Sequence, residues 1–233
     1  MRNKFSEIVS KIGYRDERIC VVVADISPAG AMIKFREKFP KRFINCGVAE
    51  QSMIGIAAGM ALRGMRPFCY TIASFSLFRP FEMVRVDLCY QNLPVTIVGM
   101  GAGSTYSTLG GTHLTQEDIS VARSIPNMTI ISPCDPLELE SAVDYCSKSS
   151  NAPVYLRIGK AGEKNYTEQA KTKWQFGKVR QIFNGSQLCF LSHGSIIKKC
   201  FELKADLKKY NIKPSIYSVS TLKPLDKRGI KKI

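Results

Sequence analysis

The sequence contains no apolar run long enough to cross a membrane. Its longest apolar stretches, such as residues 94–102, fall well short of the roughly 20 residues that a membrane-spanning helix needs. The first residues, MRNKFSEIVSKIG, have a basic start with no apolar segment behind it, which is not the pattern of a secretory signal. We therefore expect a cytoplasmic protein that does not bind membranes.

Paired cysteines and histidines are also scarce. The 8 cysteines are scattered singly without a C-x-x-C pair, and the 2 histidines are His113 and His193. This distribution argues against a structural zinc site. Single cysteines in apolar surroundings are typical of small buried thiols, so we expect no disulfide framework.

Acidic residues are few, which leaves a formal net charge of +15. A nucleic-acid-binding protein would concentrate its lysines and arginines on one element, with aromatic residues between them. Here the excess lies mostly in the last third of the chain, in short runs such as 198–199, 208–209 and 227–228. That scatter indicates solvated helix faces and loops, so we expect no nucleic-acid partner.

Short β-branched runs alternate with helical patterns over the first 160 residues. The predicted strands are residues 19–24, 67–71, 94–100, 128–131 and 154–157, and the predicted helices are residues 5–12, 29–39, 49–63, 78–90, 117–124 and 136–147. This alternation predicts an α/β fold: a mostly parallel sheet with helices on both faces. Such sheets bind ligands at the carboxyl ends of their strands, so the chemistry is expected in the loops that follow them.

The pattern changes after residue 160. Residues 161–185 are polar and irregular, as expected of a linker, and residues 186–233 begin a second, smaller unit. The smaller unit has a predicted strand at 188–192, a helix at 196–209 and a strand at 214–219. One β-α-β unit of this size cannot cover both faces of a sheet, so it either docks on another surface or is a shortened domain.

The most informative segment is FPKRFINCGVAEQ, residues 39–51. A short strand leads to Gly47, and a helix then opens with Glu50 in its first turn. Gly55 and Gly59 follow on one face of that helix, where they would let another helix approach closely. Taken alone, Glu50 is as well explained as a helix cap. Its surroundings favour a catalytic role, because the G-V-A-E-Q segment resembles the pyrimidine-domain signature of the transketolase family.

The resemblance implies a cofactor and a role for Glu50. In that family the glutamate of this motif contacts N1′ of the aminopyrimidine ring of thiamine diphosphate. A carboxyl group suits this position because sharing a proton with N1′ activates the cofactor.

Three phenylalanines follow the next predicted strand. Phe75, Phe78 and Phe81 recur at three-residue spacing, so they can share one side of a turn that leads into a helix. Such an aromatic wall suits a flat heteroaromatic ring, at about 1 kcal/mol per stacked pair. The family has aromatic residues here around the aminopyrimidine, and Phe75 and Phe78 match those positions best. Aromatics at this spacing are otherwise usually core residues.

A glycine-rich loop, residues 99–117, contains the segment Gly-Gly-Thr-His113 near its end. This segment resembles the family's G-x-T-H segment, in which the histidine reaches the sugar substrate. His113 is therefore a candidate for a substrate hydrogen bond or a proton shuttle, and a solvated loop histidine is the alternative. Leu109 stands where many members carry an acidic residue, and the loop start lacks their histidine. The pattern is closer to small split transketolases than to single-chain ones, and the substrate stays open.

Three further residues are candidates for substrate binding. Arg2 lies in a pattern that resembles the family's opening arginine, and Arg157 follows a strand where relatives have a phosphate-contacting arginine. Guanidinium groups bind phosphate bidentately, although salt bridges would explain both residues equally well. Asp25 ends the first predicted strand, where it either lines the same crevice or only turns the chain.

The sequence also lacks the G-D-G segment with which the family binds the metal and the diphosphate of the cofactor. The resemblance places that motif in a separate domain, with the cofactor between the two. We therefore expect an obligate partner, a separate N-terminal transketolase subunit that holds most of the contacts to Mg2+ or Ca2+. The expected assembly is a dimer of heterodimers, inactive without the partner.

The expected activity is that of a transketolase, a glycolaldehyde transferase that moves a two-carbon ketol unit between sugars or sugar phosphates. Two other enzymes of the superfamily remain open alternatives: a deoxyxylulose-phosphate synthase-like protein and a 2-oxoacid dehydrogenase E1 beta-like subunit. A third alternative is a non-catalytic pyrimidine domain that is retained for assembly.

Overall fold

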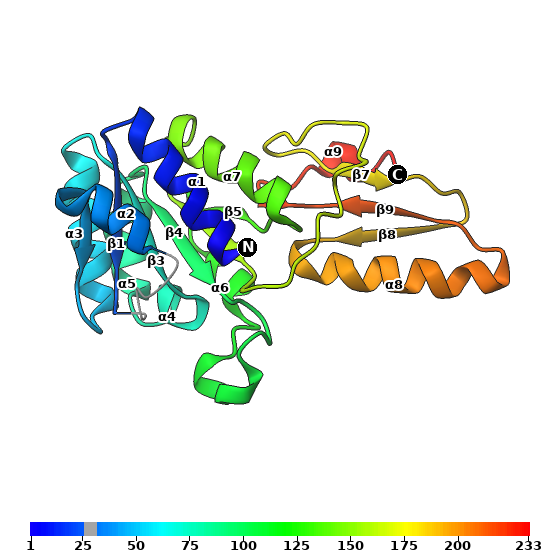
Figure 1. Ribbon diagram of the computed structural model, residues 1–233, viewed down its shortest axis with the longest axis horizontal. Helices are drawn as coiled ribbons and strands as arrows, with labels where there is room; N and C mark the ends of the chain where they lie inside the picture. The colour runs from blue at the N-terminus through cyan, green and yellow to red at the C-terminus, as the bar shows by residue number, and fades with distance from the viewer. Residues whose placement is uncertain (26–31) are drawn as a thin grey trace.

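The computed structural model describes residues 1–25 and 32–233, and Figure 1 shows a larger and a smaller part. The larger part is built on a seven-stranded sheet of order β10-β5-β6-β4-β3-β1-β2. Its strands are β1 (Ile19–Val23), β2 (Phe43–Asn45), β3 (Arg66–Ile72), β4 (Thr96–Met100), β5 (Thr129–Ile131), β6 (Val154–Ile158) and β10 (Thr221–Lys223). All neighbours pair in parallel except β10, which runs antiparallel to β5. The expected α/β fold with a mostly parallel sheet is confirmed.

Helices cover both faces of this sheet. The helices are α1 (Arg2–Arg15), α2 (Ile33–Lys38), α3 (Glu50–Leu62), α4 (Ala73–Leu77), α5 (Phe81–Met83), α6 (Asp118–Ser124) and α7 (Pro136–Lys148). Side chains alternate along each strand, so Val21 and Val23 of β1 face one apolar cluster with α1 and α7. Val22 faces the other cluster, which includes residues of α3. Because helices cover both faces, every residue of β1 and of β4 is buried.

The strand register brings the carboxyl ends to one edge. Val23 of β1 pairs with Asn45 of β2 and with Tyr70 of β3, and Met100 at the end of β4 pairs with Ile72 and Ile158. The loops after these strands therefore share one side of the larger part. No helix within the described ranges is long and apolar enough to cross a membrane.

Two helical predictions differ from the structure. The helix expected over 78–90 begins later than predicted: α4 ends at Leu77, and α5 begins only after Pro80, followed without a gap by a π-helical segment, Val84–Tyr90. Pro80 has no backbone N–H and its ring crowds the preceding turn, so a continuous helix cannot pass through it. The helix expected over 29–39 is α2, and its first predicted residues, 29–31, lie outside the described residues.

The smaller part is a three-stranded sheet of order β7-β9-β8. It comprises β7 (Arg180–Phe183), β8 (Leu188–Ser192), α8 (Ile197–Leu207) and β9 (Pro214–Ser218), and a short helix, α9 (Lys227–Ile230), lies near the end of the chain. β7 lies within the segment expected to be a linker, because Arg180–Phe183 pairs antiparallel with β9. β10 then leaves the smaller part and joins β5. The smaller unit therefore docks on the larger one, which was one of the two expected outcomes.

A buried polar cluster joins the two parts. The Glu138 carboxylate in α7 is fully buried and accepts hydrogen bonds from the Cys134 backbone N–H at 3.1 Å and the Ser218 hydroxyl at 2.9 Å. Burial raises the pKa of Glu138, although these hydrogen bonds oppose the shift. Nearby, the Trp174 indole N–H donates to the Ser220 hydroxyl at 2.7 Å. Polar side chains therefore join α7 to β9, and the segment that precedes β7 to the residue before β10.

Candidate active site

Glu50 lies at the start of α3, at the edge where the parallel strands end. Gly47 adopts a positive φ of 68° between β2 and α3, and its N–H donates to the Asn45 side chain at 3.1 Å. The Glu50 side chain makes no helix-capping hydrogen bond, and it is only 2% exposed. Its two carboxylate oxygens instead accept from Nη1 of Arg79 at 3.0 and 3.1 Å. The carboxylate thus faces the segment between α4 and α5 and is shielded from solvent.

Arg79 links Glu50 to the aromatic segment. Its guanidinium carbon lies 4.1 Å from the centre of the Phe75 ring, so the cation covers one face of that ring. The Arg79 side chain is 44% exposed, whereas Glu50 is buried. Arg79 therefore lies toward the solvent side of the carboxylate.

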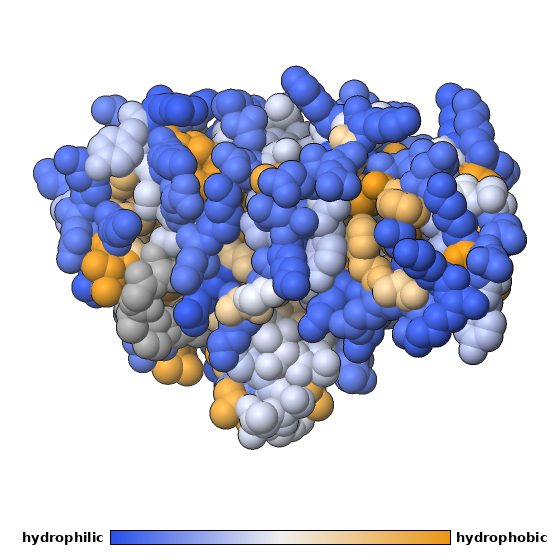
Figure 2. Space-filling view, turned by 45° about the vertical axis from the view of Figure 1, so that its right-hand side comes forward, coloured by the Kyte–Doolittle hydropathy of each residue, from blue (hydrophilic) through white to orange (hydrophobic). Residues whose placement is uncertain are grey.

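His113 reaches the same place from the glycine-rich loop. Its ring lies edge-on to Phe75, with 5.1 Å between the centroids, and Nδ1 is 2.9 Å from the Thr112 hydroxyl. The loop projects from the body of the larger part in Figure 1, and in Figure 2 the projection is pale, of neutral hydropathy. Gly101, at a φ of 71°, gives room to Tyr106, whose ring also lies edge-on to His113. The structure thus brings Glu50, Phe75 and His113 together.

The other two predicted phenylalanines lie differently. Phe78 follows the last residue of α4 and is 37% exposed, whereas Phe81 is half-buried against the apolar cluster that includes α3. Within the described part of the chain, Phe75 is the one of the three whose ring meets both Arg79 and His113. A cofactor contact by Phe78 or Phe81 stays a prediction.

Arg157 is held in a buried ion pair. Its Nε donates to Oδ2 of Asp118 at 2.7 Å, and the Tyr155 hydroxyl donates to the same oxygen at 2.8 Å. Arg157 also reaches the Thr115 carbonyl at 3.4 Å, at the base of the projecting loop. Gly99 makes room for Tyr155, because a side chain at Gly99 would collide with the tyrosine ring. Phosphate binding by Arg157 stays a prediction. In the structure the contacts of Arg157 with Asp118 and Thr115 hold the base of the projecting loop.

Arg2 and Asp25 lie near the same edge. Arg2 begins α1, and its backbone N–H donates to the Lys160 carbonyl, just after β6, at 3.2 Å. Burial raises the pKa of the Tyr106 hydroxyl and the charge of Arg2 opposes the shift, which places Arg2 near the loop that carries His113. Asp25 is exposed at a positive φ of 41°, and its N–H donates to Asn45 at 3.1 Å. Substrate contacts by either residue stay predictions.

Two site residues were not predicted from the sequence: Arg79 and Asp118. Arg79 follows Phe75 by four residues, the spacing that brings side chains together on one helix face, and this was the available signal. Asp118 gave no comparable signal, because its partners Tyr155 and Arg157 lie 37 and 39 residues away.

The site fits the pyrimidine end of thiamine diphosphate better than its diphosphate end. A buried carboxylate, Glu50, lies beside an aromatic face, Phe75, and these are the groups that a flat ring with a basic nitrogen requires. No cluster of three or more His, Cys, Asp or Glu residues that could hold a metal ion occurs within residues 1–25 and 32–233. The geometry therefore supports a pyrimidine pocket in this chain.

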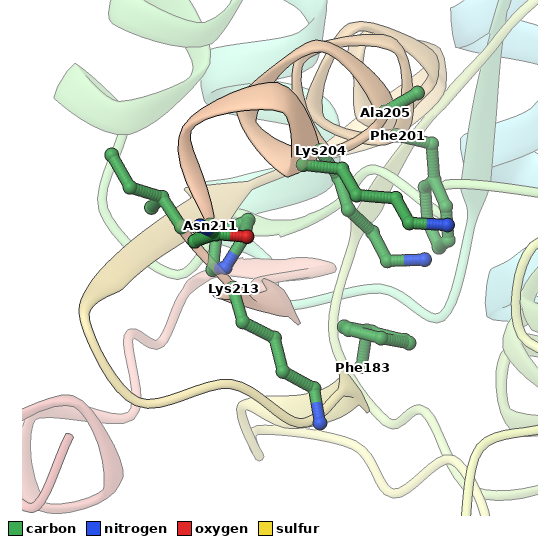
Figure 3. Close-up of a pocket in the computed structure, with 9 residues that line it drawn as sticks. Phe183, Phe201, Lys204, Ala205, Asn211 and Lys213 are labelled. Carbon is green, nitrogen blue, oxygen red and sulfur yellow. The ribbon is translucent and has the colours of Figure 1, made fainter.

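A second hollow lies in the smaller part, away from these residues (Figure 3). Its volume is about 500 Å³, and its lining includes Phe183 and Phe201 together with Lys204 of α8 and two lysines that follow this helix, Lys208 and Lys213. The ammonium group of Lys204 lies 3.7 Å from the centre of the Phe183 ring. None of the predicted site residues lines this hollow.

Curated relatives resemble the chain over its whole length. It is 31% identical over 235 aligned residues to an apulose-4-phosphate transketolase subunit of Phocaeicola vulgatus, covering 99% of this chain and 74% of that protein. It is 33% identical over 233 residues to a "Putative transketolase C-terminal section" of Methanocaldococcus jannaschii, covering 100% of this chain and 73% of that protein. The chain thus spans about three quarters of each.

Solved structures and family models agree with these relatives. A structure described as "Split gene transketolase, inactive beta4 tetramer" superposes with a TM-score of 0.88 at 28% identity, covering 99% of this chain and 74% of that one. Residues 1–162 match the model for the transketolase pyrimidine-binding domain, and residues 177–233 match the model for the transketolase C-terminal domain. The chain belongs to the transketolase family, in the part that binds the pyrimidine in split enzymes.

Proposed function

We propose that this chain is the pyrimidine-binding component of a two-chain, thiamine-diphosphate-dependent transketolase that transfers a two-carbon ketol unit between sugars or sugar phosphates. The observation that carries the proposal is the buried Glu50 carboxylate beside the Phe75 ring at the carboxyl edge of the sheet. The family match, the relative named as a transketolase subunit and the split-gene structure support it.

Each residue of the site has a proposed task. Glu50 holds a proton at N1′ of the aminopyrimidine, and Phe75 provides the face on which that ring lies. His113, beside Phe75 on the projecting loop, donates a hydrogen bond to a substrate oxygen or moves a proton to it. When bound, the cofactor supplies the carbon nucleophile that carries the ketol unit.

The rest of the cofactor site belongs to a second chain. The proposed partner is a separate N-terminal transketolase subunit with the diphosphate motif, which holds most of the contacts to Mg2+ or Ca2+. A dimer of heterodimers is the proposed assembly. The relative described as an "inactive beta4 tetramer" supports the expectation that this chain alone has no activity.

The test is ketol transfer by the assembled complex. The chain is purified together with a partner that carries the G-D-G motif, and release of aldehyde from ketose donors is measured. Glu50→Gln is expected to lower kcat by at least about 100-fold, the usual contribution of one acid–base group. Glu82→Gln is the matched control, because Glu82 is exposed and pairs with Arg85 rather than with the site.

Other outcomes would identify another function. An active complex that is unaffected by Glu50→Gln would contradict the proposed role of Glu50. A complex that assembles without activity would favour a domain kept for assembly. A preference for pyruvate over ketose donors would favour a deoxyxylulose-phosphate synthase-like or E1 beta-like enzyme. The chain is also 32% identical over 224 residues to a 1-deoxy-D-xylulose-5-phosphate synthase of Clostridium perfringens, covering 96% of this chain and 36% of that protein.

A further inference from the structure

We propose that Arg79 is a displaceable plug, which occupies the aminopyrimidine position in the cofactor-free chain and must leave when thiamine diphosphate binds. This inference rests on the proposed function and adds a residue that competes with the cofactor. It follows from where the Arg79 guanidinium lies.

The guanidinium makes the two contacts that the pyrimidine ring requires. It is planar, it donates from Nη1 to both Glu50 oxygens at 3.0 and 3.1 Å, and its carbon lies 4.1 Å from the Phe75 ring centre. An aminopyrimidine is likewise flat, with nitrogen atoms at its edge and a face for stacking. The face of Phe75 that the guanidinium covers cannot also hold a stacked pyrimidine ring, so one group must displace the other there.

Burial explains why the cofactor-free chain needs such a group. Glu50 is 2% exposed, and an ionised carboxylate at that depth is strongly unfavourable without a partner. Among the described residues, Arg79 is the cation that forms a salt bridge with Glu50. The Arg79 charge therefore offsets the cost of burying the Glu50 carboxylate.

The position of Arg79 also allows it to leave. Arg79 lies between the end of α4 at Leu77 and the start of α5 at Phe81, and its side chain is 44% exposed. Its side chain can therefore rotate toward solvent without breaking either helix.

Displacement changes the hydrogen-bond partners of the carboxylate. With Arg79 in place both Glu50 oxygens accept from its Nη1, whereas the proposed role of Glu50 requires a hydrogen bond to N1′. Cofactor binding therefore has to break a charge-assisted interaction, and binding should strengthen when Arg79 is absent.

The experiment measures the Kd for thiamine diphosphate of the assembled two-chain complex, with Mg2+ at saturation, by calorimetry at a single pH. Arg79→Met keeps an unbranched side chain on Phe75 and removes the charge. Its Kd is expected to fall by roughly tenfold, the equivalent of one charge-assisted hydrogen bond no longer broken. Arg85→Met is the control, because Arg85 forms an exposed pair with Glu82 at 2.9 Å, and its Kd should not change.

An unchanged or raised Kd in Arg79→Met would contradict the proposal that Arg79 competes with the cofactor. If that variant does not assemble, Arg79→Lys keeps the charge but loses the planar stack. Its Kd should then lie below that of the wild type, and a Kd equal to or above the wild-type value would also overturn the proposal. These results are separable from the proposed function. If activity requires Glu50 but the Kd does not change in Arg79→Met, the proposed function stands and the role of Arg79 is contradicted. If the complex does not bind thiamine diphosphate at all, both proposals are contradicted.

Discussion

The two sheets of this protein use similar strands and bury them very differently. β1 and β3 pair in parallel, as do β8 and β9, and both β1 and β8 are rich in apolar residues. Every residue of β1 is buried between two helical layers, whereas Leu188 and Leu191 of β8 are 41% and 48% exposed. An apolar strand is therefore buried only where layers cover both of its faces, and the candidate active site lies in the part where they do.

The smaller part also depends on the larger one for its core. Its buried apolar cluster consists of Ile182, Ile197 and Ile216 together with Cys134, which follows β5 of the large sheet. The Glu138 carboxylate crosses the same boundary to Ser218. The smaller part is thus stabilised partly by contacts with its neighbour, and substitutions in the two parts should have different effects.

The largest effect is expected in the centre of the large sheet. Ile97 of β4 is fully buried, so Ile97→Ala leaves a cavity that little can fill. The free energy of unfolding should fall by about 2–5 kcal/mol, measured by urea denaturation. A loss below about 1 kcal/mol would contradict a close-packed sheet here.

The junction should show the next largest effect. Glu138→Ala leaves the buried Cys134 N–H and the Ser218 hydroxyl without their acceptor, which should cost about 1–3 kcal/mol. Trp174 is the single tryptophan, so a red shift of its fluorescence before global unfolding would report loosening at the boundary. Glu140→Ala, an exposed site on the same helix, is the control. Equal effects of both variants would mean that the two parts do not depend on this carboxylate.

A pH dependence is expected from His193, at the end of β8 in the same boundary. Burial lowers its pKa and the charge of Arg157 lowers it further, although Asp118 acts in the opposite direction. The unfolded chain therefore binds more protons below the ordinary value of 6.5. Stability should be fully present above that pH and decline as pH falls, by less than about 1.4 kcal/mol per pH unit.

His193→Gln should remove this decline between about pH 6.5 and 5, as measured by urea unfolding at each pH. His113→Gln, on the projecting loop, should leave the decline in place. A decline of the same size in both variants would assign it to other groups.

The smallest effect is expected on the uncovered face of β8. Leu191 is 48% exposed, so Leu191→Ala should change the unfolding free energy by no more than about 0.5 kcal/mol. This variant is the partner of Ile97→Ala, since both shorten an aliphatic strand residue. A loss comparable to that of Ile97→Ala would show that another surface covers β8 in solution.

Local sequence patterns predicted those parts of the fold that depend on local sequence. The alternation of strands and helices over residues 1–160 predicted the parallel sheet, because each strand needed only to be apolar and bounded by turns. β7 and β10 were missed because each forms by pairing with a strand distant in the sequence, β9 and β5 respectively, which no local signal identifies as its partner. The late start of the helix expected over 78–90 had a visible cause in Pro80.

The candidate site was predicted only in part for a related reason. The motif around Glu50 and the spacing of the phenylalanines that begins at Phe75 could be recognised in the sequence. The contact between Arg79 and Glu50 could not, because it joins positions 29 residues apart. Gly99 and Gly101 make room for Tyr155 and Tyr106, which no local pattern in the sequence indicates. Contacts between distant residues decide such details, and one sequence does not contain them.

β10 and the residues beside it connect the two parts through backbone hydrogen bonds. Thr221 pairs with Ile131, the Ser132 N–H donates to the Ser220 carbonyl at 2.7 Å, and the Gly194 N–H donates to the Ser132 carbonyl at 3.0 Å. Swinging the parts open would break this ladder, so hinge motion within the chain is a poor route for admitting a ligand. In the two-chain enzyme proposed above, access to Glu50 is therefore expected to depend on the approach of the partner chain, so chain association and coenzyme binding should be coupled.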